Sequence, residues 1–327
     1  MQPASTPFDQ TEAREVIAKL ADSLESNFVF PEVGKQYAAM LRSKLGAGDY
    51  DSFANARAFS DAVTRDLQAV HKDGHLKLFA PAPGGTGPRR MAMTSSEKST
   101  VLASGMLVPD VAYISFEEFS GNDATMADVR AFLDKAKGAK TLIIDARRHR
   151  GGGLDEMDLM FPQLFTKHTA LLDMDSRVAA EERNGNPFEG TPSMERINGP
   201  DGVIRRRHSV TPAAHPALGK TKVYLLTSAK SASAAEHLAL ALKRTHRATL
   251  VGETTRGAGN FGHPLPLGFG YMAFVPMGRT FDPDTGEGWE GVGVKPDVAV
   301  PVDQALDKAL ELAGVKADAK VALAGLR

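Results

Sequence analysis

The sequence contains no cysteine, no long hydrophobic run and almost no net charge. The absence of cysteine excludes disulfide bonds, thiolate zinc sites and a cysteine nucleophile. No stretch of about 18 apolar residues occurs, so we expect no membrane-spanning helix. The 39 Lys and Arg residues are balanced by 40 Asp and Glu residues, which argues against nucleic acid as a partner. The overall composition is that of an ordinary globular protein.

The length of 327 residues exceeds the usual size of one domain, so we expect two lobes. Residues 10–45 and 53–70 have apolar side chains at helical spacing. A dense cluster of proline and glycine follows at 81–88 and marks a boundary. We therefore predict an N-terminal helical lobe over residues 1–80 and a second domain over residues 81–327.

Short apolar strands alternate with helices in this second domain. Strands are predicted at 111–116 and 141–145, and helices at 124–137 and 154–165. Crossovers of this length permit parallel pairing, so the sequence predicts an α/β fold. The long segment at about 167–220 has no clear periodicity, and we expect it to form a hairpin-bearing flap over a cleft.

The first seven residues lack a basic segment and an apolar segment behind it. A secretory signal is therefore expected to be either absent or already removed from this chain. The lack of cysteine is compatible with an oxidising compartment but does not require one.

The most informative segment is Ser-Ala-Ser-Ala-Ala-Glu at residues 231–236. It follows an apolar strand at 223–227 and precedes a helix that includes residues 238–242. A serine carried from a strand into a helix N-terminus has an exposed hydroxyl, and the first free N–H groups of the helix stabilise negative charge beside it. A serine before a helix is also a common N-cap, so this segment alone permits either role.

Two further segments carry groups that are useful in hydrolysis. The strand that ends at Asp145 continues into three glycines at 151–153. Glycines there allow backbone N–H groups to point into a site, although a simple tight turn has the same composition. The segment Asp-Gly-His at 73–75 places a histidine between a helix and a strand, where it is either structural or catalytic.

The order of these segments resembles the carboxyl-terminal-processing (tail-specific) serine peptidase family. The matching segments are the Asp-x-Arg turn with its glycines at 145–153, the serine turn at 231–236, Gly-Glu-Thr at 252–254 and Gly-Val-Gly-Val-Lys-Pro-Asp at 291–297. The resemblance implies a core similar to crotonase and the Clp protease, with repeated strand-strand-helix units and no PDZ domain. It also implies a hydrolase that cleaves peptides or unfolded proteins in the periplasm or outside the cell, with a cytoplasmic location left open.

The sequence departs from the processing peptidases at one place. Those enzymes use a Ser–Lys pair whose lysine lies just beyond Gly-Glu-Thr, and here Ala258 occupies that place. The sequence is more similar to the branch of tricorn protease and the interphotoreceptor retinoid-binding proteins, and tricorn protease uses a histidine base. The resemblance then implies Ser233 as nucleophile, His75 as base and Glu290 as the acid that orients the imidazole.

The same resemblance implies an oxyanion hole made of backbone donors. One donor is the N–H of Ala234, and the other is the N–H of Gly151 or Gly152. Loss of one such donor typically costs about 2.7–4 kcal/mol of transition-state stabilisation.

Three charged residues are candidates for supporting roles. Glu236 follows the serine by one helical turn, where a carboxylate is favoured by the helix dipole. Arg147 and Arg150 flank the glycines, and we expect one of them to bind a substrate carboxylate.

Metal and cofactor motifs are weak in this sequence. His71 and His75 have i,i+4 spacing, but Gly74 and the strand behind it argue against one helix that carries both. Residues 257–262 match the dinucleotide fingerprint, but two prolines follow and prevent the helix that this motif needs. We therefore expect no cofactor and no metal. The expected partners are peptide or unfolded-protein substrates, and the chain is a candidate homo-oligomer.

Two functions stay open at this point. One is a serine peptidase, and the other is a non-catalytic binding protein for apolar ligands on the same fold. The presence of Ser233, His75 and Glu290 together favours catalysis, because a binding protein has no need of all three.

Overall fold

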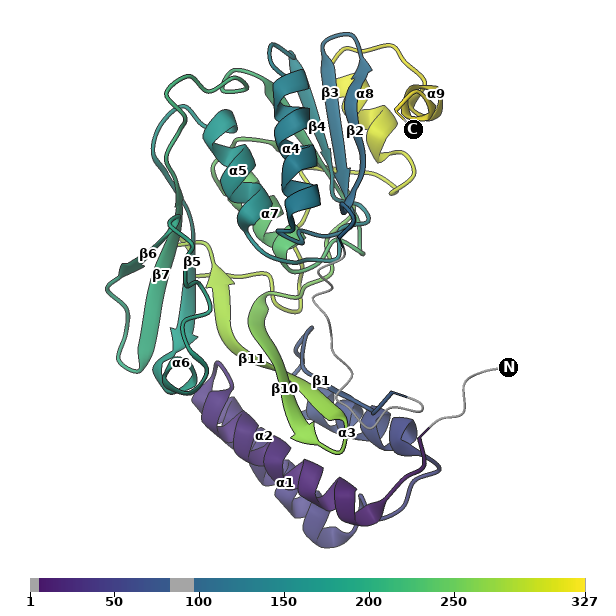
Figure 1. The fold of residues 1–327 in the computed structure, drawn as a ribbon, viewed down its shortest axis with the longest axis vertical. Helices are drawn as coiled ribbons and strands as arrows, with labels where there is room; N and C mark the ends of the chain where they lie inside the picture. The colour runs from purple at the N-terminus through teal and green to yellow at the C-terminus, as the bar shows by residue number, and fades with distance from the viewer. Residues whose placement is uncertain (1–5, 83–96, 327) are drawn as a thin grey trace.

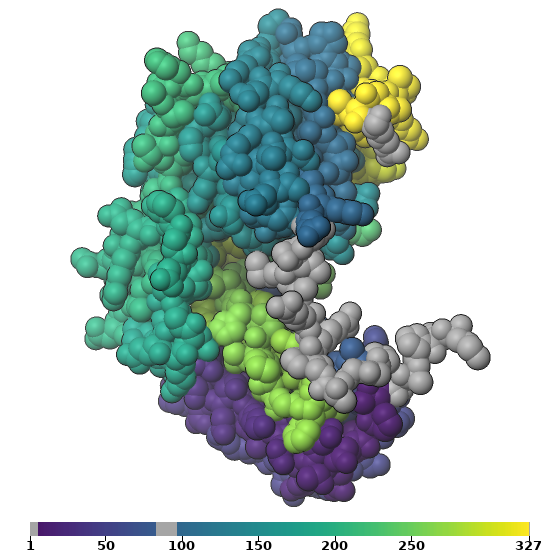
Figure 2. Space-filling model, in the orientation of Figure 1, coloured from purple at the N-terminus to yellow at the C-terminus, as the bar shows by residue number. Residues whose placement is uncertain are grey.

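The computed structural model describes residues 6–82 and 97–326, and the chain forms two lobes connected by long strands (Figure 1). The upper lobe contains a sheet between layers of helices, and the lower lobe contains the N-terminal helices with a hairpin. The space-filling view shows the surface indented between the lobes (Figure 2). The turn cluster predicted at 81–88 lies mostly outside the described residues.

The upper lobe is built on a six-stranded sheet in which every neighbouring pair except one is parallel. The strand order is β12-β9-β8-β4-β3-β2, and only β2 is antiparallel to its neighbour. The strands are β2 (Val101–Val108), β3 (Val111–Phe116), β4 (Thr141–Asp145), β8 (Lys222–Thr227), β9 (Thr249–Gly252) and β12 (Val298–Ala299). Every residue of β3 and β4 is buried, as expected when helices cover both faces.

Helices cover the two faces of this sheet. One face packs against α4 (Asp123–Lys135), α5 (Asp155–Leu164) and α7 (Ala234–Arg244) in one apolar cluster. The other face packs against α8 (Ala305–Leu312) and α9 (Ala319–Ala324) in a second cluster. The mixed α/β fold predicted from the alternating pattern is confirmed.

The lower lobe combines the start of the chain with a hairpin from its last third. Its core contains Leu20 and Phe59 from the helices and Tyr271 and Val275 from the hairpin. The predicted helical stretch at 10–45 is interrupted where a new helix begins at Pro31. The elements are α1 (Gln10–Asn27), α2 (Pro31–Ala47), α3 (Ala56–Val70), β1 (Lys77–Phe79), β10 (Asn260–Gly268) and β11 (Tyr271–Phe281).

The segment expected to be irregular has regular structure of its own. It contains β5 (Thr169–Arg177), α6 (Val178–Asn184), β6 (Met194–Ile197) and β7 (Val203–Val210). Its strands continue the sheet of the lower hairpin in the order β1-β11-β5-β7-β6. The expected hairpin is formed by β6 and β7, and the segment contains more regular structure than its weak periodicity indicated.

The carboxyl ends of β3 and β4 point toward the lower lobe (Figure 1). The loops that follow the parallel strands of the upper sheet therefore face the N-terminal elements, and open α/β sheets bind ligands at this edge. Over the described ranges 6–82 and 97–326, no helix has both the length and the apolarity that a membrane crossing requires.

Candidate active site

Ser233 lies at the start of α7, directly after the turn that leaves β8. Its φ is 55° and its ψ is -116°, a strained conformation for a residue other than glycine. The turn is held by two serine hydroxyls, because Ser231 donates to the Ala146 carbonyl at 2.7 Å and Ser228 donates to the Arg147 carbonyl at 2.6 Å. Such strain persists where the surrounding structure fixes it, and it clusters at functional sites.

The glycine loop after β4 passes beside Ser233. A Cβ atom added to Gly151 would lie 2.9 Å from the Ser233 Cβ, so only glycine permits this approach. A Cβ atom on Gly152 would lie 1.9 Å from the carbonyl oxygen of Phe119. The loop is held in place because Phe119 donates to the Gly151 carbonyl and Gly153 donates to the Phe119 carbonyl, each at 2.8 Å.

The backbone N–H groups of the glycine loop and of the start of α7 differ in whether they have an acceptor. The Gly151 N–H donates to Nδ1 of His149 at 3.1 Å. Within the described part of the chain, the N–H groups of Gly152 and Ala234 donate to no protein acceptor. Two unpaired donors on either side of a serine are the arrangement that an oxyanion hole needs.

His75 lies in the turn between α3 and β1. Its ring stacks on Phe274 of β11 with centroids 5.1 Å apart, which fixes the plane of the imidazole. The turn is shaped by the Asp73 carboxylate, which accepts the N–H groups of His75 at 2.9 Å and Leu76 at 3.0 Å. Nδ1 of His75 is buried and has no hydrogen-bond partner among the described residues.

His75 and the residue before Ser233 line one hollow of about 460 Å³. Ala232, Arg150 and Arg256 contribute to the same hollow, so the serine turn, the glycine loop and the histidine turn meet there. In the described residues no hydrogen bond joins the Ser233 hydroxyl to the His75 ring, and such bonds often form only when substrate is bound.

Glu236 is fully buried and binds four donors. Its carboxylate accepts the backbone N–H of Ser233 at 2.9 Å and the hydroxyl of Thr255 at 2.6 Å. It also accepts the N–H groups of Gly257 at 2.6 Å and Ala258 at 2.8 Å. Burial raises the pKa of Glu236, while these hydrogen bonds favour the ionised form and oppose the shift. The carboxylate thus connects the serine turn to the loop at 257–260.

Glu290 binds the other half of that loop. It accepts the N–H groups of Gly259 at 2.6 Å and Asn260 at 2.8 Å, and on its second oxygen the N–H of Gly74 at 2.6 Å. Burial and the charge of Asp73 raise the pKa of Glu290, and the three N–H groups oppose this. Glu290 therefore holds the turn that carries His75, and the functional atoms of Asp73, His75 and Glu290 lie within 4.8 Å of one another.

Ala258, which stands where the related processing peptidases have lysine, packs against the histidine turn. A Cβ atom on Gly74 would lie 3.0 Å from the Ala258 Cα and 3.1 Å from its Cβ. The Ala258 carbonyl accepts the indole N–H of Trp289 at 3.0 Å. Ala258 therefore packs directly against the turn that carries His75, and it lines the same hollow as His75.

The pKa of His75 is lowered by burial and by the positive charge of Arg256, while the Asp73 carboxylate opposes the shift. Burial is the largest of these effects. A lowered pKa keeps the imidazole neutral and able to accept a proton near neutral pH.

The two arginines predicted to bind substrate lie on different hollows. Arg150 lines the hollow with His75 and forms an ion pair with Glu117. Arg147 donates to Asp145 at 2.5 Å and to the Val302 carbonyl at 2.9 Å, and it lines a separate hollow of about 640 Å³. Arg147 is thus committed to intramolecular bonds, and Arg150 is the better placed of the two.

The cluster of Asp73, His75 and Glu290 has the composition of a metal site, but its oxygens are already used. Both oxygens of Asp73 accept N–H groups, including the side-chain amide of Asn260 at 2.9 Å, and so do both oxygens of Glu290. The donor set fits a hydrogen-bonded turn better than a cation.

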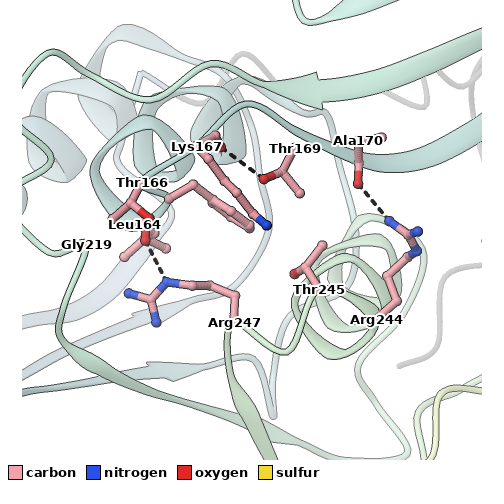
Figure 3. A pocket seen from close by; sticks show the side chains of 10 residues that line it. Leu164, Thr166, Lys167, Thr169, Ala170, Gly219, Arg244, Thr245 and Arg247 are labelled. Carbon is pink, nitrogen blue, oxygen red and sulfur yellow. Dashed lines mark hydrogen bonds between the residues drawn. The ribbon is translucent and has the colours of Figure 1, made fainter.

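A further hollow of about 340 Å³ lies between α5, β5 and α7 (Figure 3). None of the predicted site residues lines it. Its arginines are tied to backbone carbonyls, since Arg247 donates to Leu164 at 2.6 Å and Arg244 donates to Ala170 at 2.7 Å. These guanidinium groups therefore hold the ends of α5, β5 and α7 together.

Sequence reasoning missed several residues that build the site. Asn260 and Trp289 hold the loop at 257–260, and His149 holds the glycine loop. Asp73 followed by Gly74 is a recognisable turn signal, so the turn at Asp73 could have been predicted from the sequence. No local pattern identifies His149, because its role depends on tertiary burial.

We expect buried His149 to make folding stability sensitive to acid. Burial lowers the pKa of His149 to about 3, whereas an unfolded chain has a histidine pKa of about 6.5. Between pH 6.5 and about 3, only the unfolded state binds the proton. The contribution of His149 to the free energy of unfolding therefore falls by about 1.4 kcal/mol per pH unit as the pH decreases. Urea titrations followed by the fluorescence of Trp289, the single tryptophan, measure this slope.

His149→Asn provides the control, because asparagine does not titrate. The variant should lose stability less steeply than the wild type between pH 6.5 and about 3. Equal slopes in the two proteins would contradict a buried neutral imidazole.

The arrangement of a strained serine, a glycine loop and a histidine is typical of serine hydrolases. Two family models match the chain: Peptidase family S41 over residues 110–300, and the N-terminal domain of Peptidase_S41 in eukaryotic IRBP over residues 10–113. The first match covers more than half of the sequence. The chain belongs to peptidase family S41.

A curated relative agrees with this assignment. The chain is 26% identical over 249 residues to a chloroplastic C-terminal processing peptidase of Tetradesmus obliquus, a match that covers 71% of this chain and 47% of the relative. The chain thus spans about half the length of that curated relative.

Solved structures show the same fold at low identity. The photosystem II D1 C-terminal processing protease superposes with a TM-score of 0.54 at 17% identity, over 96% of this chain and 100% of that one. The tricorn protease superposes with a TM-score of 0.59 at 14% identity, over 97% of this chain and 36% of that one.

Proposed function

We propose that the protein hydrolyses peptide bonds with Ser233 as nucleophile, His75 as general base and Glu290 as the carboxylate beside the base. The oxyanion hole consists of the Ala234 N–H and an N–H from the glycine loop. The loop at 257–260 carries this proposal: the carboxylates of buried Glu236 and half-buried Glu290 bind its four successive N–H groups. Through Glu236 and Glu290 the same loop ties the serine turn to the histidine turn.

In the first step, the Ser233 Oγ attacks the peptide carbonyl carbon and its proton passes to a neutral nitrogen of His75. The carbonyl oxygen becomes an oxyanion held by the backbone donors. The imidazolium then gives the proton to the leaving amine as the C–N bond breaks. Water releases the acyl group by the same sequence, again with His75 accepting the proton.

Glu290 acts on the base through charge and position. Its carboxylate stabilises the imidazolium that forms during both steps, because the two groups lie within 4.8 Å of each other. Glu236 has a supporting role, since it binds the backbone N–H of Ser233 and is itself fully buried.

Short or unfolded peptides are the proposed substrates. The hollow of about 460 Å³ beside His75 is large enough for side chains of an extended segment and too small for a folded protein. Arg150 is the proposed contact for a substrate carboxylate, because it lines this hollow. We also propose that the protein is periplasmic or secreted and that it forms a homo-oligomer.

A fluorophosphonate probe tests this function directly, because it reacts with a serine only when the hydroxyl is activated. The wild type should be labelled at Ser233, as located by peptide mass mapping, and Ser233→Ala should not be labelled. Ser209→Ala is the control from outside the site and should keep the label, because Ser209 lies in β7 and lines a different hollow.

Absence of labelling in folded wild-type protein would refute the peptidase mechanism. The result would then favour a binding protein for apolar ligands on the same fold.

A further inference from the structure

His149 lies in the glycine loop but has no part in the proton transfers proposed above. Its side chain is completely buried, and its ring stands edge-on to Phe119 with centroids 4.2 Å apart. Its carbonyl accepts the N–H of Ala232 at 3.1 Å. One residue therefore contacts both the glycine loop and the serine turn.

The hydrogen bond from Gly151 fixes the state of the His149 ring. Nδ1 accepts the Gly151 N–H at 3.1 Å, so this nitrogen carries no proton. Over residues 6–82 and 97–326 no carboxylate contacts the ring, and burial favours its neutral form. The proton must then lie on Nε2, which is buried with no hydrogen-bond partner among the described residues. Buried groups left unpaired in this way call for an explanation.

The same bond decides which glycine is free to bind substrate. Gly151 uses its N–H on His149 and its carbonyl on the N–H of Phe119. In a trans peptide the following N–H, that of Gly152, points opposite to this carbonyl and away from Phe119. Gly152 is then the loop residue whose donor is available.

We propose that His149 is a positioning residue of the oxyanion hole. By accepting the Gly151 N–H it sets the glycine loop so that Gly152, together with Ala234, supplies the two donors for the oxyanion. The inference rests on the proposed peptidase function and assigns a specific task to each glycine. It requires the neutral tautomer with the proton on Nε2.

A pair of substitutions separates the acceptor from the packing. His149→Leu fills space but removes the acceptor, and His149→Asn keeps an acceptor oxygen near the position of Nδ1. We expect His149→Leu to lower kcat for peptide hydrolysis by about 10²–10³-fold, with KM changed less than about threefold. His149→Asn should stay within about tenfold of the wild type. Rates are normalised to folded protein by Trp289 fluorescence.

Equal kcat values per folded molecule for the wild type and His149→Leu would overturn the proposal, since a purely structural role changes only the folded fraction. If His149→Leu does not fold, nitrogen NMR of the wild-type imidazole decides: the Nε2–H tautomer supports the proposal and the Nδ1–H tautomer overturns it. A wild type that fails to react with the fluorophosphonate refutes the proposed function instead, and the tautomer still tests His149 separately.

Discussion

We expect Ser233→Ala and His75→Ala each to lower kcat/KM for peptide hydrolysis by at least about 10³-fold, and the double variant to lose no more than either single variant. In the proposed mechanism the two side chains act in one proton transfer, so once either is removed the other contributes nothing further to catalysis. A fluorogenic peptide assay on the three purified variants measures this. Losses that add up in the double variant would contradict the pairing.

His71→Ala is the matched control for the histidine. His71 belongs to the same turn, and its ring packs against Phe30 rather than lining the hollow beside His75. We expect this variant to keep the activity of the wild type. A loss comparable to that of His75→Ala would assign the effect to the turn rather than to the imidazole.

The pH profile gives a second check on His75. The base works only when neutral, so activity is present above its pKa and is lost as the pH falls through it. Because burial and Arg256 lower this pKa from 6.5, the acidic limb of kcat/KM should lie below pH 6.5. Arg256→Gln removes one cause of the shift and should move the limb to higher pH.

Gly152→Ala should lower kcat by about 10²–10³-fold, comparable to the loss of one oxyanion donor. The added Cβ would lie 1.9 Å from the Phe119 carbonyl oxygen, and the φ of 122° is one that alanine rarely adopts. The loop must shift, and the donors beside Ser233 shift with it. Steady-state kinetics at saturating peptide measure the effect on kcat.

Gly153→Ala is the control one residue further along the same loop. Its added Cβ would meet only the Asp155 side chain, at 3.2 Å, and its φ is not in the left-handed region. We expect near-normal activity. Equal losses in the two glycine variants would argue that the loop tolerates no substitution at all, and would remove the special role of Gly152.

The elements with local signals were predictable from the sequence. The strand at 141–145 matches β4 at both ends, because a short apolar run bounded by polar residues has few alternatives. The segment at 167–220 was not predictable in the same way. Its strand β7 contains Arg205, Arg206 and Arg207, which pair with acidic residues of β5 and α6 and hide the usual alternation of apolar and polar residues.

The hairpin in the lower lobe could not be found locally either. Residues such as Tyr271 and Val275 pack against helices from the beginning of the chain, a contact between distant parts of the sequence. The same reason applies at the site. The serine turn was apparent from its small residues, but the convergence of Glu236 and Glu290 on one loop arises only in three dimensions.

The pairing of β1 with residues 272–274 of β11 has a consequence for synthesis. The ribosome releases the His75 turn early, but that turn has no sheet to join until the hairpin far downstream has emerged. A nascent chain therefore holds the proposed base and nucleophile apart. By the proposed mechanism, cleavage of itself or of neighbouring polypeptides would begin only after this hairpin has been synthesised.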